Sequence, residues 1–261
     1  MSWQEQAIEL AKQGRPRKFN KLVAGQVYTM NDGSKLKVLQ VLSGKEVLAE
    51  FQDEYKHIIS VDAHRIVNGL IKNPYYKSVY GVGFTGVGEY SSSVKGKHTL
   101  AYSRWKGMLE RCYSEKFKKG HPSYKDCVVA EDWHNFQNFA GWFYSQRFSD
   151  VYELDKDLLF KGNKLYSANT CCFLPKEINS ALVRSICDPD NTIGIKITSS
   201  GKYSAEYRDD SGKKYLGSFS TEMEAFQNYA AARKSYIKSL AEKFRDTLDS
   251  RAFCRLMEWE V

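Results

Sequence analysis

Lysine and arginine side chains are concentrated in one stretch of this 261-residue chain, and such side chains bind anions. Residues 95–125 contain nine Lys or Arg and only two acidic residues, which gives the stretch a net charge of +7. The whole chain carries +8. A charge concentrated in this way favours a polyanionic partner, nucleic acid first. Arg104, Lys106 and Arg111 belong to the stretch, and we expect them to follow a DNA backbone.

A second set of basic and aromatic residues alternates along three short segments nearer the C-terminal end. Because alternate residues of a β-strand share a face, each segment presents such residues on one side. The expected pairs are Lys196 with Thr198, Glu206 with Arg208, and Lys213 with Tyr215, while Lys202 and Tyr203 follow a turn. A sheet face of Lys, Arg and Tyr can contact both phosphates and base edges of DNA.

The cysteines and histidines indicate no covalent chemistry. Cys171 and Cys172 are adjacent, so they cannot act as a C-x-x-C zinc pair. Together with Cys112 and Cys127 they could in principle form a metal site, but we expect all four to be buried thiols. No Ser/His/Asp or Cys/His arrangement is local enough to indicate a covalent nucleophile.

The composition argues against three classes of protein: membrane-spanning, secreted and disulfide-rich. No run of 18 apolar residues exists, so no membrane-spanning helix is expected. The first 18 residues lack the apolar segment of a secretory signal, and the six cysteines form no regular disulfide pattern. We therefore expect a reduced, cytoplasmic protein without a membrane partner.

The elements that must position these side chains form an expected α+β fold of three units. Residues 1–72 should hold a short helix over 3–13 and a small antiparallel β domain, like a barrel, with four strands separated by turns at 31–33 and 43–44. The segment 63–69 should be a turn. Residues 73–90, rich in Gly and Tyr, should form an ordered linker, with nucleic-acid contact as the alternative.

The middle unit, residues 73–190, should contain two helices, over 99–114 and 133–147. Trp133, Phe136, Phe139 and Phe143 form an aromatic stripe that we assign to the core. A strand and loop should then lead into a helix that begins near Pro175, with a boundary at 187–191.

The last unit, residues 191–261, should contain three antiparallel strands and one long helix over 222–248. Turns are expected at 199–201 and 209–212. Thr221 and Glu224 have the spacing of a capping box, which would begin the helix.

This last unit resembles the AP2 DNA-binding domain, a three-stranded sheet packed on one helix. The matching segments are Gly194-Ile195-Lys196, Gly201-Lys202-Tyr203, Ala205-Glu206-Tyr207-Arg208 and Tyr215-Leu216-Gly217-Ser218-Phe219. The resemblance implies that the sheet lies in the major groove of double-stranded DNA. Several Arg and Trp positions of the family are Lys or Tyr here, which implies weaker sequence preference because Lys reads guanine less well.

The middle unit resembles phage-type HNH nucleases that carry AP2 domains. The matching positions are Trp105, Met108, Arg111-Cys112, Trp133, Phe136, Phe139, Leu154-Asp155, the segment 166–171 and Asn179. The resemblance implies a ββα site in which Asp155 and Asn179 hold Mg²⁺ or Mn²⁺ and Asn169 orients the general base. It also implies hydrolysis of DNA phosphodiester bonds, in an infected host cell if the gene belongs to a phage.

The general-base position of that family falls on Lys156, and a lysine is protonated near neutral pH. Asp157 is a second candidate base or ligand, and His98, His121 or His134 could supply a base from elsewhere. Three functions therefore stay open: a DNA endonuclease, a DNA-binding regulator or accessory factor without catalysis, and a phage module that blocks a host enzyme. An exposed charged turn at 155–157 is the structural alternative.

Overall fold

A computed structural model describes residues 22–148, 150–183 and 194–261. These form an α+β protein with two compact units, of which the first ends at Glu89 and the second begins at Tyr90. The predicted helix over 3–13 and the predicted boundary at 187–191 lie outside the described residues. The sequence expectation of three units put boundaries at 72 and 190, whereas the backbone contacts group the middle and C-terminal parts into one unit.

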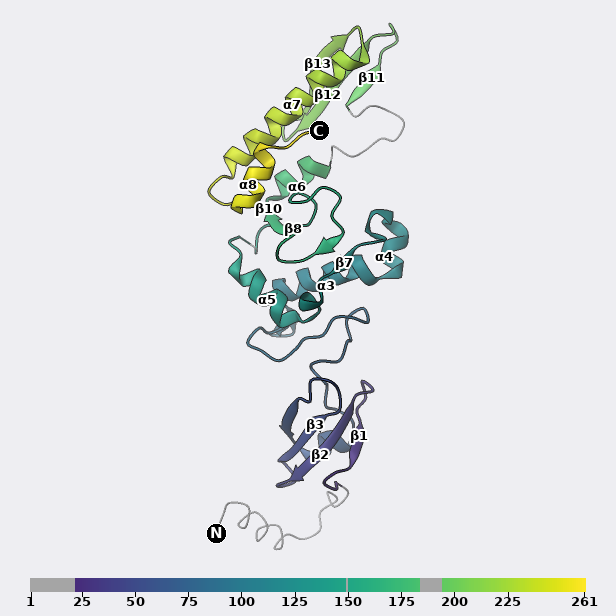
Figure 1. Cartoon of the computed structure of the whole chain (residues 1–261), viewed down its shortest axis with the longest axis vertical. Helices are drawn as coiled ribbons and strands as arrows, with labels where there is room; N and C mark the ends of the chain where they lie inside the picture. Colours follow the sequence, from purple (N-terminus) through teal and green to yellow (C-terminus); the bar gives the residue numbers. More distant parts are fainter. Residues whose placement is uncertain (1–21, 149, 184–193) are drawn as a thin grey trace. The chain divides into compact units, whose positions relative to one another are not determined.

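The N-terminal unit is a four-stranded antiparallel sheet in the order β1-β2-β3-β4 (Figure 1). Its strands are β1 (Val27–Thr29), β2 (Lys35–Val41), β3 (Val47–Phe51) and β4 (Ile58–Val61). Alternate residues such as Leu36 and Val38 are fully buried beneath the sheet, as period-two patterning predicts. β1 and β4 remain edges, so the sheet is open and not a closed barrel. The predicted turn at 63–69 is in part the short helix α2 (Ala63–Val67), capped by Asp62.

The Tyr-rich segment after this sheet packs against it. Asn73 donates from Nδ2 to Oδ2 of Asp53 over 2.5 Å, and Tyr75 stacks on Tyr55 with 4.1 Å between ring centroids. The N-terminal unit therefore extends to Glu89 and not to residue 72.

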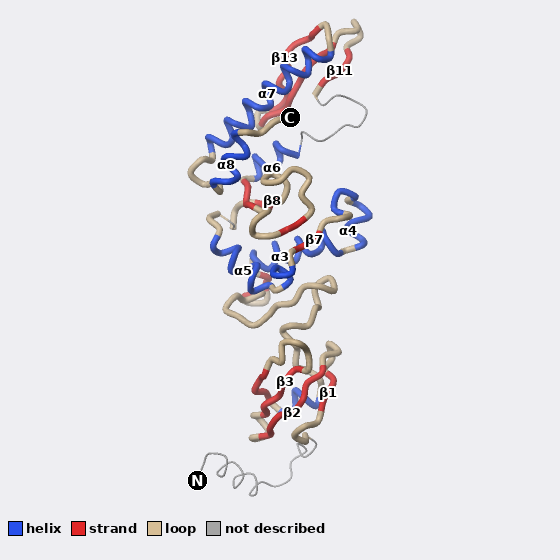
Figure 2. The backbone as a smooth tube through the Cα atoms, viewed as in Figure 1, coloured by secondary structure: helices blue, strands red, loops and turns tan. Residues whose placement is uncertain are grey.

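The second unit begins with a helical layer. Figure 2 shows that helices dominate the backbone here, whereas the N-terminal unit consists mostly of strands and loops. The elements are β5 (Ser93–Val94), β6 (Lys97–His98), α3 (Leu100–Tyr113), α4 (Glu115–Gly120), β7 (Val128–Val129) and α5 (Phe136–Ser145), with single 3-10 turns at Pro122–Tyr124 and Glu131–His134. The four residues of the aromatic stripe are all buried, which confirms their assignment to the core. Trp105 is also buried and donates its indole N–H to the carbonyl of Trp133 over 2.7 Å.

A small ββα arrangement follows. β8 (Glu153–Asp155) pairs antiparallel with β10 (Cys172–Leu174), and α6 (Lys176–Val183) begins directly after Pro175. Between the two strands, β9 (Leu165–Tyr166) pairs with β7 in parallel.

The C-terminal part is a three-stranded antiparallel sheet on a long helix, as predicted. β11 (Ile195–Ile197), β12 (Tyr203–Asp209) and β13 (Gly212–Phe219) pack on α7 (Glu222–Lys243), which ends before the predicted residue 248 and is followed by α8 (Ser250–Met257). Thr221 and Glu224 form the predicted capping box.

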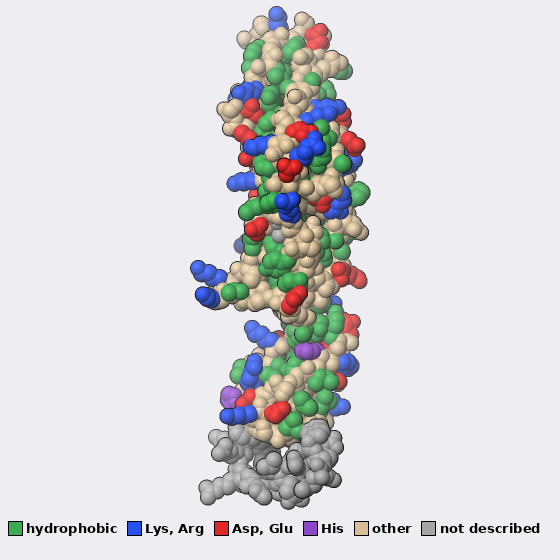
Figure 3. Space-filling view, turned by 90° about the vertical axis from the view of Figure 1, so that its left-hand side faces the viewer, with side chains coloured by type: hydrophobic (Ala, Val, Ile, Leu, Met, Phe, Trp, Pro, Cys, Tyr) green, Lys and Arg blue, Asp and Glu red, His purple; other side chains and the backbone are tan. Residues whose placement is uncertain are grey.

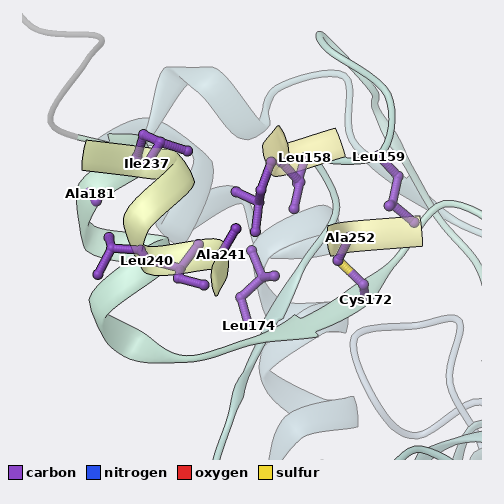
Figure 4. Close-up of a cluster of buried hydrophobic side chains, with 11 residues drawn as sticks. Leu158, Leu159, Cys172, Leu174, Ala181, Ile237, Leu240, Ala241 and Ala252 are labelled. Carbon is purple, nitrogen blue, oxygen red and sulfur yellow. The ribbon is translucent and has the colours of Figure 1, made fainter. Parts of the chain in front are cut away.

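Helix α7 belongs to two cores. Its first half buries Ala225 and Tyr229 against the three-stranded sheet. Its second half buries Ile237, Leu240 and Ala241 with Leu174 of β10 and with residues of the 158–159 loop, α6 and α8 (Figure 4). Between the two halves, the buried Arg233 donates to the carbonyl of Ala181 in α6 over 2.6 Å. The sheet and the ββα arrangement thus share one helix.

Gly194 has a conformation and a neighbour that exclude any side chain. Its φ is +75°, and an added Cβ would lie 2.2 Å from the buried ring of Tyr229. We expect Gly194→Ala to lower the free energy of unfolding by about 3 kcal/mol, through overpacking and left-handed strain. Gly201→Ala is the matched control because φ is +76° and nothing lies within 4 Å of its added Cβ. Strain alone should cost about 1 kcal/mol there. Equal losses in urea unfolding would contradict the account of Tyr229.

Candidate functional site

The three-stranded sheet has two chemically different faces. The face toward α7 contains Ile195 and Ala205, both buried. On the other face, cross-strand pairing places Lys196 beside Ser204, Glu206 beside Tyr215, and Arg208 beside Lys213. We call the side chains of Lys196, Ser204, Glu206, Arg208, Lys213 and Tyr215 the outer face. The face-sharing predicted for Glu206 with Arg208 and for Lys213 with Tyr215 is thereby confirmed.

The outer face is open to solvent. The side chains of Lys196 and Lys213 are 64% and 58% exposed, and Tyr215 is 67% exposed. A β-bulge between Ala205 and Glu206 lies at its centre. The sheet therefore presents a surface that a large ligand can reach.

Glu206 organises the charges of the outer face. Its Oε1 accepts from Lys196 Nζ over 2.8 Å and from Lys213 Nζ over 3.2 Å. These hydrogen bonds lower the pKa of Glu206, so its carboxylate is ionised near neutral pH. Three cationic side chains then share the face with one carboxylate. Exposed ion pairs contribute little to stability, so phosphates can replace Glu206 as the partner of the two lysines at a small cost in free energy.

Two other residues predicted to contact DNA take different positions. Lys202 is exposed in the turn between β11 and β12, where its backbone N–H donates to Oγ1 of Thr198 over 3.1 Å. Tyr203 is half-buried and packs against the hydrophobic core beside α7. Tyr203 is thus on the opposite side from the outer face.

A second constellation lies in the ββα arrangement, around a cavity of about 280 Å³. It brings together six predicted site residues: Arg104, Arg111, Asp155, Lys156, Asp157 and Asn179. Glu153, Tyr124 and Tyr166 also line it. Lys106 and Asn169 do not line the cavity. Lys106 is exposed elsewhere on α3, and Asn169 is exposed in a turn, where its backbone carbonyl accepts from Arg251. Asn169 is therefore not placed to orient a base here.

Helix α3 supplies the cationic wall of the cavity. Arg104, Gly107 and Arg111 lie three and four residues apart and so share one helical face. Gly107 leaves open space, because an added Cβ would meet nothing within 4 Å. Arg104 donates from Nη2 to the carbonyl of Tyr152 over 3.2 Å, while its buried Nε has no hydrogen-bond partner.

Acidic and amide oxygens face this wall. Glu153 and Asp155 alternate on β8, and Oε2 of Glu153 accepts from Asn179 Nδ2 over 2.6 Å. Oδ1 of Asp155 accepts from the backbone N–H groups of Leu158 and Asp157 over 2.8 and 2.9 Å. Burial raises the pKa of Asp155, and these backbone bonds oppose the rise. Glu153 is a cavity residue that the sequence patterns did not indicate, although its position two residues before Asp155 on the same strand was the available signal.

Lys156 occupies the position expected for a general base but is buried and tied down. Its Nζ donates to Oδ1 of Asp157 over 2.5 Å and to the carbonyl of Asn163 over 3.0 Å. Burial works to lower the pKa of Lys156, but its hydrogen bond to Asp157 outweighs burial and the pKa is raised. Lys156 is therefore protonated near neutral pH and cannot accept a proton.

The cavity offers oxygen donors of the kind that bind a divalent cation. Carboxylate and amide oxygens of Glu153, Asp155 and Asn179 are the ligand type that Mg²⁺ and Mn²⁺ prefer, so these residues fit such an ion. No cluster of three or more His, Cys, Asp or Glu side chains is arranged for a metal within the described residues. The cavity lining described here includes no histidine; His121 stacks on Phe117 instead, and His134 contacts Tyr113.

The cysteines behave as buried thiols. Cys112, Cys127, Cys171 and Cys172 are buried and unpaired by disulfides. Burial raises the pKa of Cys112 and of Cys171 to about 12, which leaves both protonated and unreactive near neutral pH.

Comparison with known proteins finds no matching family model, no similar curated protein and no similar solved structure. Among the described helices, none is both long and apolar enough to cross a membrane.

Proposed function

We propose that this chain is a DNA-binding protein and that the outer face contacts double-stranded DNA. The observation that carries the proposal is an exposed β-surface on which Lys196 and Lys213 bind the carboxylate of Glu206 and Arg208 adds a third cation. Lysine and arginine supply the phosphate contacts that dominate affinity for DNA. The resemblance of residues 194–225 to the AP2 domain supports the same partner.

The geometry of a sheet favours duplex over other polyanions. The major groove, about 12 Å wide, admits a β-ribbon whose alternate side chains reach phosphates and base edges. Arg208 can donate two hydrogen bonds to guanine, and Tyr215 adds an exposed aromatic side chain on the same face. Figure 3 shows one face of the molecule, on which Lys and Arg side chains are interspersed with Asp and Glu side chains.

The charge distribution supports a contact through the second unit, which carries the larger positive charge. Residues 22–89 contain seven Lys or Arg and seven Asp or Glu, so the described part of the N-terminal unit has no net formal charge. Residues 1–21 carry a net formal charge of +3, and Tyr90–Val261, which contains the outer face and the basic helix α3, carries +5.

Metal-assisted hydrolysis of DNA is the second candidate function. The cavity favours it, because the oxygens of Glu153, Asp155 and Asn179 face two arginines. A bound Mg²⁺ or Mn²⁺ would neutralise charge on the phosphate under attack. The candidate bases that line the cavity are carboxylates held by other contacts, since Asp157 accepts from Lys156 and Glu153 accepts from Asn179, and Lys156 itself holds its proton. We therefore place DNA binding without hydrolysis first.

Supercoiled plasmid tests both candidates in one experiment. We expect the protein to retard plasmid in a gel at low salt. The retardation should weaken as salt rises, because Lys and Arg side chains release counterions from DNA on binding and that release is less favourable at high salt. We expect no conversion to the nicked form with Mg²⁺ or Mn²⁺. The matched control is Asp155→Asn, which removes a carboxylate from the cavity and leaves the outer face unchanged.

Two results would revise this proposal. Nicking that disappears in Asp155→Asn and in Asn179→Ala would establish the second candidate at this cavity. Absence of retardation at low salt would remove DNA binding itself.

A further inference from the structure

The turn over residues 160–164, between β8 and β9, exposes an aromatic side chain beside the cavity. Leu158 and Leu159 are buried in the core shared with α7 (Figure 4), whereas the next residue, Phe160, is 55% exposed. In the described part of the chain, the Phe160 ring pairs with no other aromatic ring. The core thus takes two of three consecutive apolar residues and leaves the third in solvent.

The turn is braced from within by Asn163. Its Nδ2 donates to the carbonyls of Lys156 and Leu165 over 2.8 and 2.7 Å, and its backbone N–H donates to the carbonyl of Phe160 over 3.0 Å. Gly162 supplies the left-handed residue of the turn, with φ of +76°. Phe160 is therefore held on a fixed support, which a loose loop would not provide.

Lys156 joins this turn to the cavity. Its ammonium group lies in the cavity wall and donates to the carbonyl of Asn163, which lies in the turn. The lysine at the expected general-base position thus positions the exposed turn relative to the cavity.

The turn that carries Phe160 is cationic. Residues 158–166 include Lys161 and Lys164, both exposed, and no acidic residue. Phosphates would be attracted to such a turn, and proteins that deform DNA insert apolar side chains such as Phe between base pairs. An exposed aromatic ring that shares one turn with two lysines matches the duplex in charge and in chemistry.

We propose that the 160–164 turn is a wedge: Lys161 and Lys164 contact the backbone of bound duplex, and Phe160 inserts between adjacent base pairs. The inference rests on the proposed DNA binding and adds a distortion of the duplex to it. Stacking of an aromatic side chain on bases then contributes to affinity together with the outer face.

A duplex that contains several 2-aminopurine bases tests the wedge, because this base fluoresces more strongly when it is unstacked. Binding of the full chain should raise the fluorescence. Phe160→Ala should remove the rise and weaken binding about tenfold. Phe160→Leu, which keeps an apolar side chain, should retain part of the rise. Val151→Ala is the matched control, since Val151 is an exposed apolar residue outside the turn and the cavity.

The outcomes separate the wedge from the function on which it rests. If Phe160→Ala gives the same rise as the unmodified chain, or if the unmodified chain binds without a rise, the wedge is wrong and DNA binding stands. If the unmodified chain shows no anisotropy change with the duplex at low salt, both the wedge and the proposed function are wrong. Equal thermal unfolding of Phe160→Ala and the unmodified chain verifies that the fold is intact.

Discussion

Replacement of Lys196, Arg208 and Lys213 together by alanine should weaken binding to duplex DNA by about 10²–10³-fold. Each side chain is a cation of the outer face, and one lost phosphate or base contact costs roughly tenfold. Glu206 would remain as an unpaired carboxylate on the same face and would repel phosphate. The fold should survive because all three side chains are exposed. Fluorescence anisotropy with a labelled duplex measures the change.

The control removes the same positive charge from the N-terminal four-stranded sheet. Lys35, Lys37 and Lys45 lie on or beside β2, and their joint replacement by alanine lowers the net charge by the same amount. If the outer face is the contact, this control should stay within about threefold of the unmodified chain, since its lysines belong to the N-terminal unit and not to the outer face. Equal losses in the two variants would show that total charge, and not the outer face, sets the affinity.

The second large effect concerns the core that α7 shares with the ββα arrangement. Leu240→Ala should lower the free energy of unfolding by about 3 kcal/mol, the usual cost of removing a buried leucine from a packed core. Because α7 also supports the three-stranded sheet, the substitution should destabilise both the ββα arrangement and that sheet. Native-state hydrogen exchange should show faster exchange in β10 and in β12 alike.

Met223→Ala is the control for this prediction, because Met223 lies on the same helix but is exposed. It should change the free energy of unfolding by less than about 0.5 kcal/mol. If Leu240→Ala speeds exchange in β10 but leaves β12 unchanged, the ββα arrangement and the sheet fold independently. The three-unit division predicted from the sequence would then describe the folding units better than one shared core.

Local patterns in the sequence identified much of the fold. Period-two alternation predicted the four N-terminal strands and the three C-terminal ones, because a strand on one core must alternate buried and exposed side chains. The capping box at Thr221 marked the start of α7 correctly. The aromatic stripe from Trp133 to Phe143 was correctly assigned to the core.

Features that depend on contacts between distant residues could not be predicted. The parallel pairing of β7 with β9 joins two-residue strands that have no pattern of their own. The core shared by Leu174 and Leu240 needs a tertiary structure before it can be seen. The packing of Tyr75 on Tyr55 likewise extends the N-terminal unit beyond the boundary that composition indicated.

The candidate cavity shows the same division. Most of its polar residues could be predicted from a resemblance or from the basic stretch 95–125. The structure brings Asp155, Asn179, Arg104 and Arg111 to one cavity. The sequence could not show that Lys156 is held by Asp157 and Asn163, because that arrangement depends on the fold of the following turn. The roles of these residues in binding or hydrolysis stay predictions.

The central claim is that the outer face binds duplex DNA, and an NMR titration of the amide-labelled chain with a duplex tests it most directly. We predict that the amide signals of Lys196, Glu206, Arg208, Lys213 and Tyr215 shift together as duplex is added at low salt, and return as salt is raised. Shifts confined to the sheet of residues 27–61, with the signals of β11–β13 unchanged, would contradict the claim.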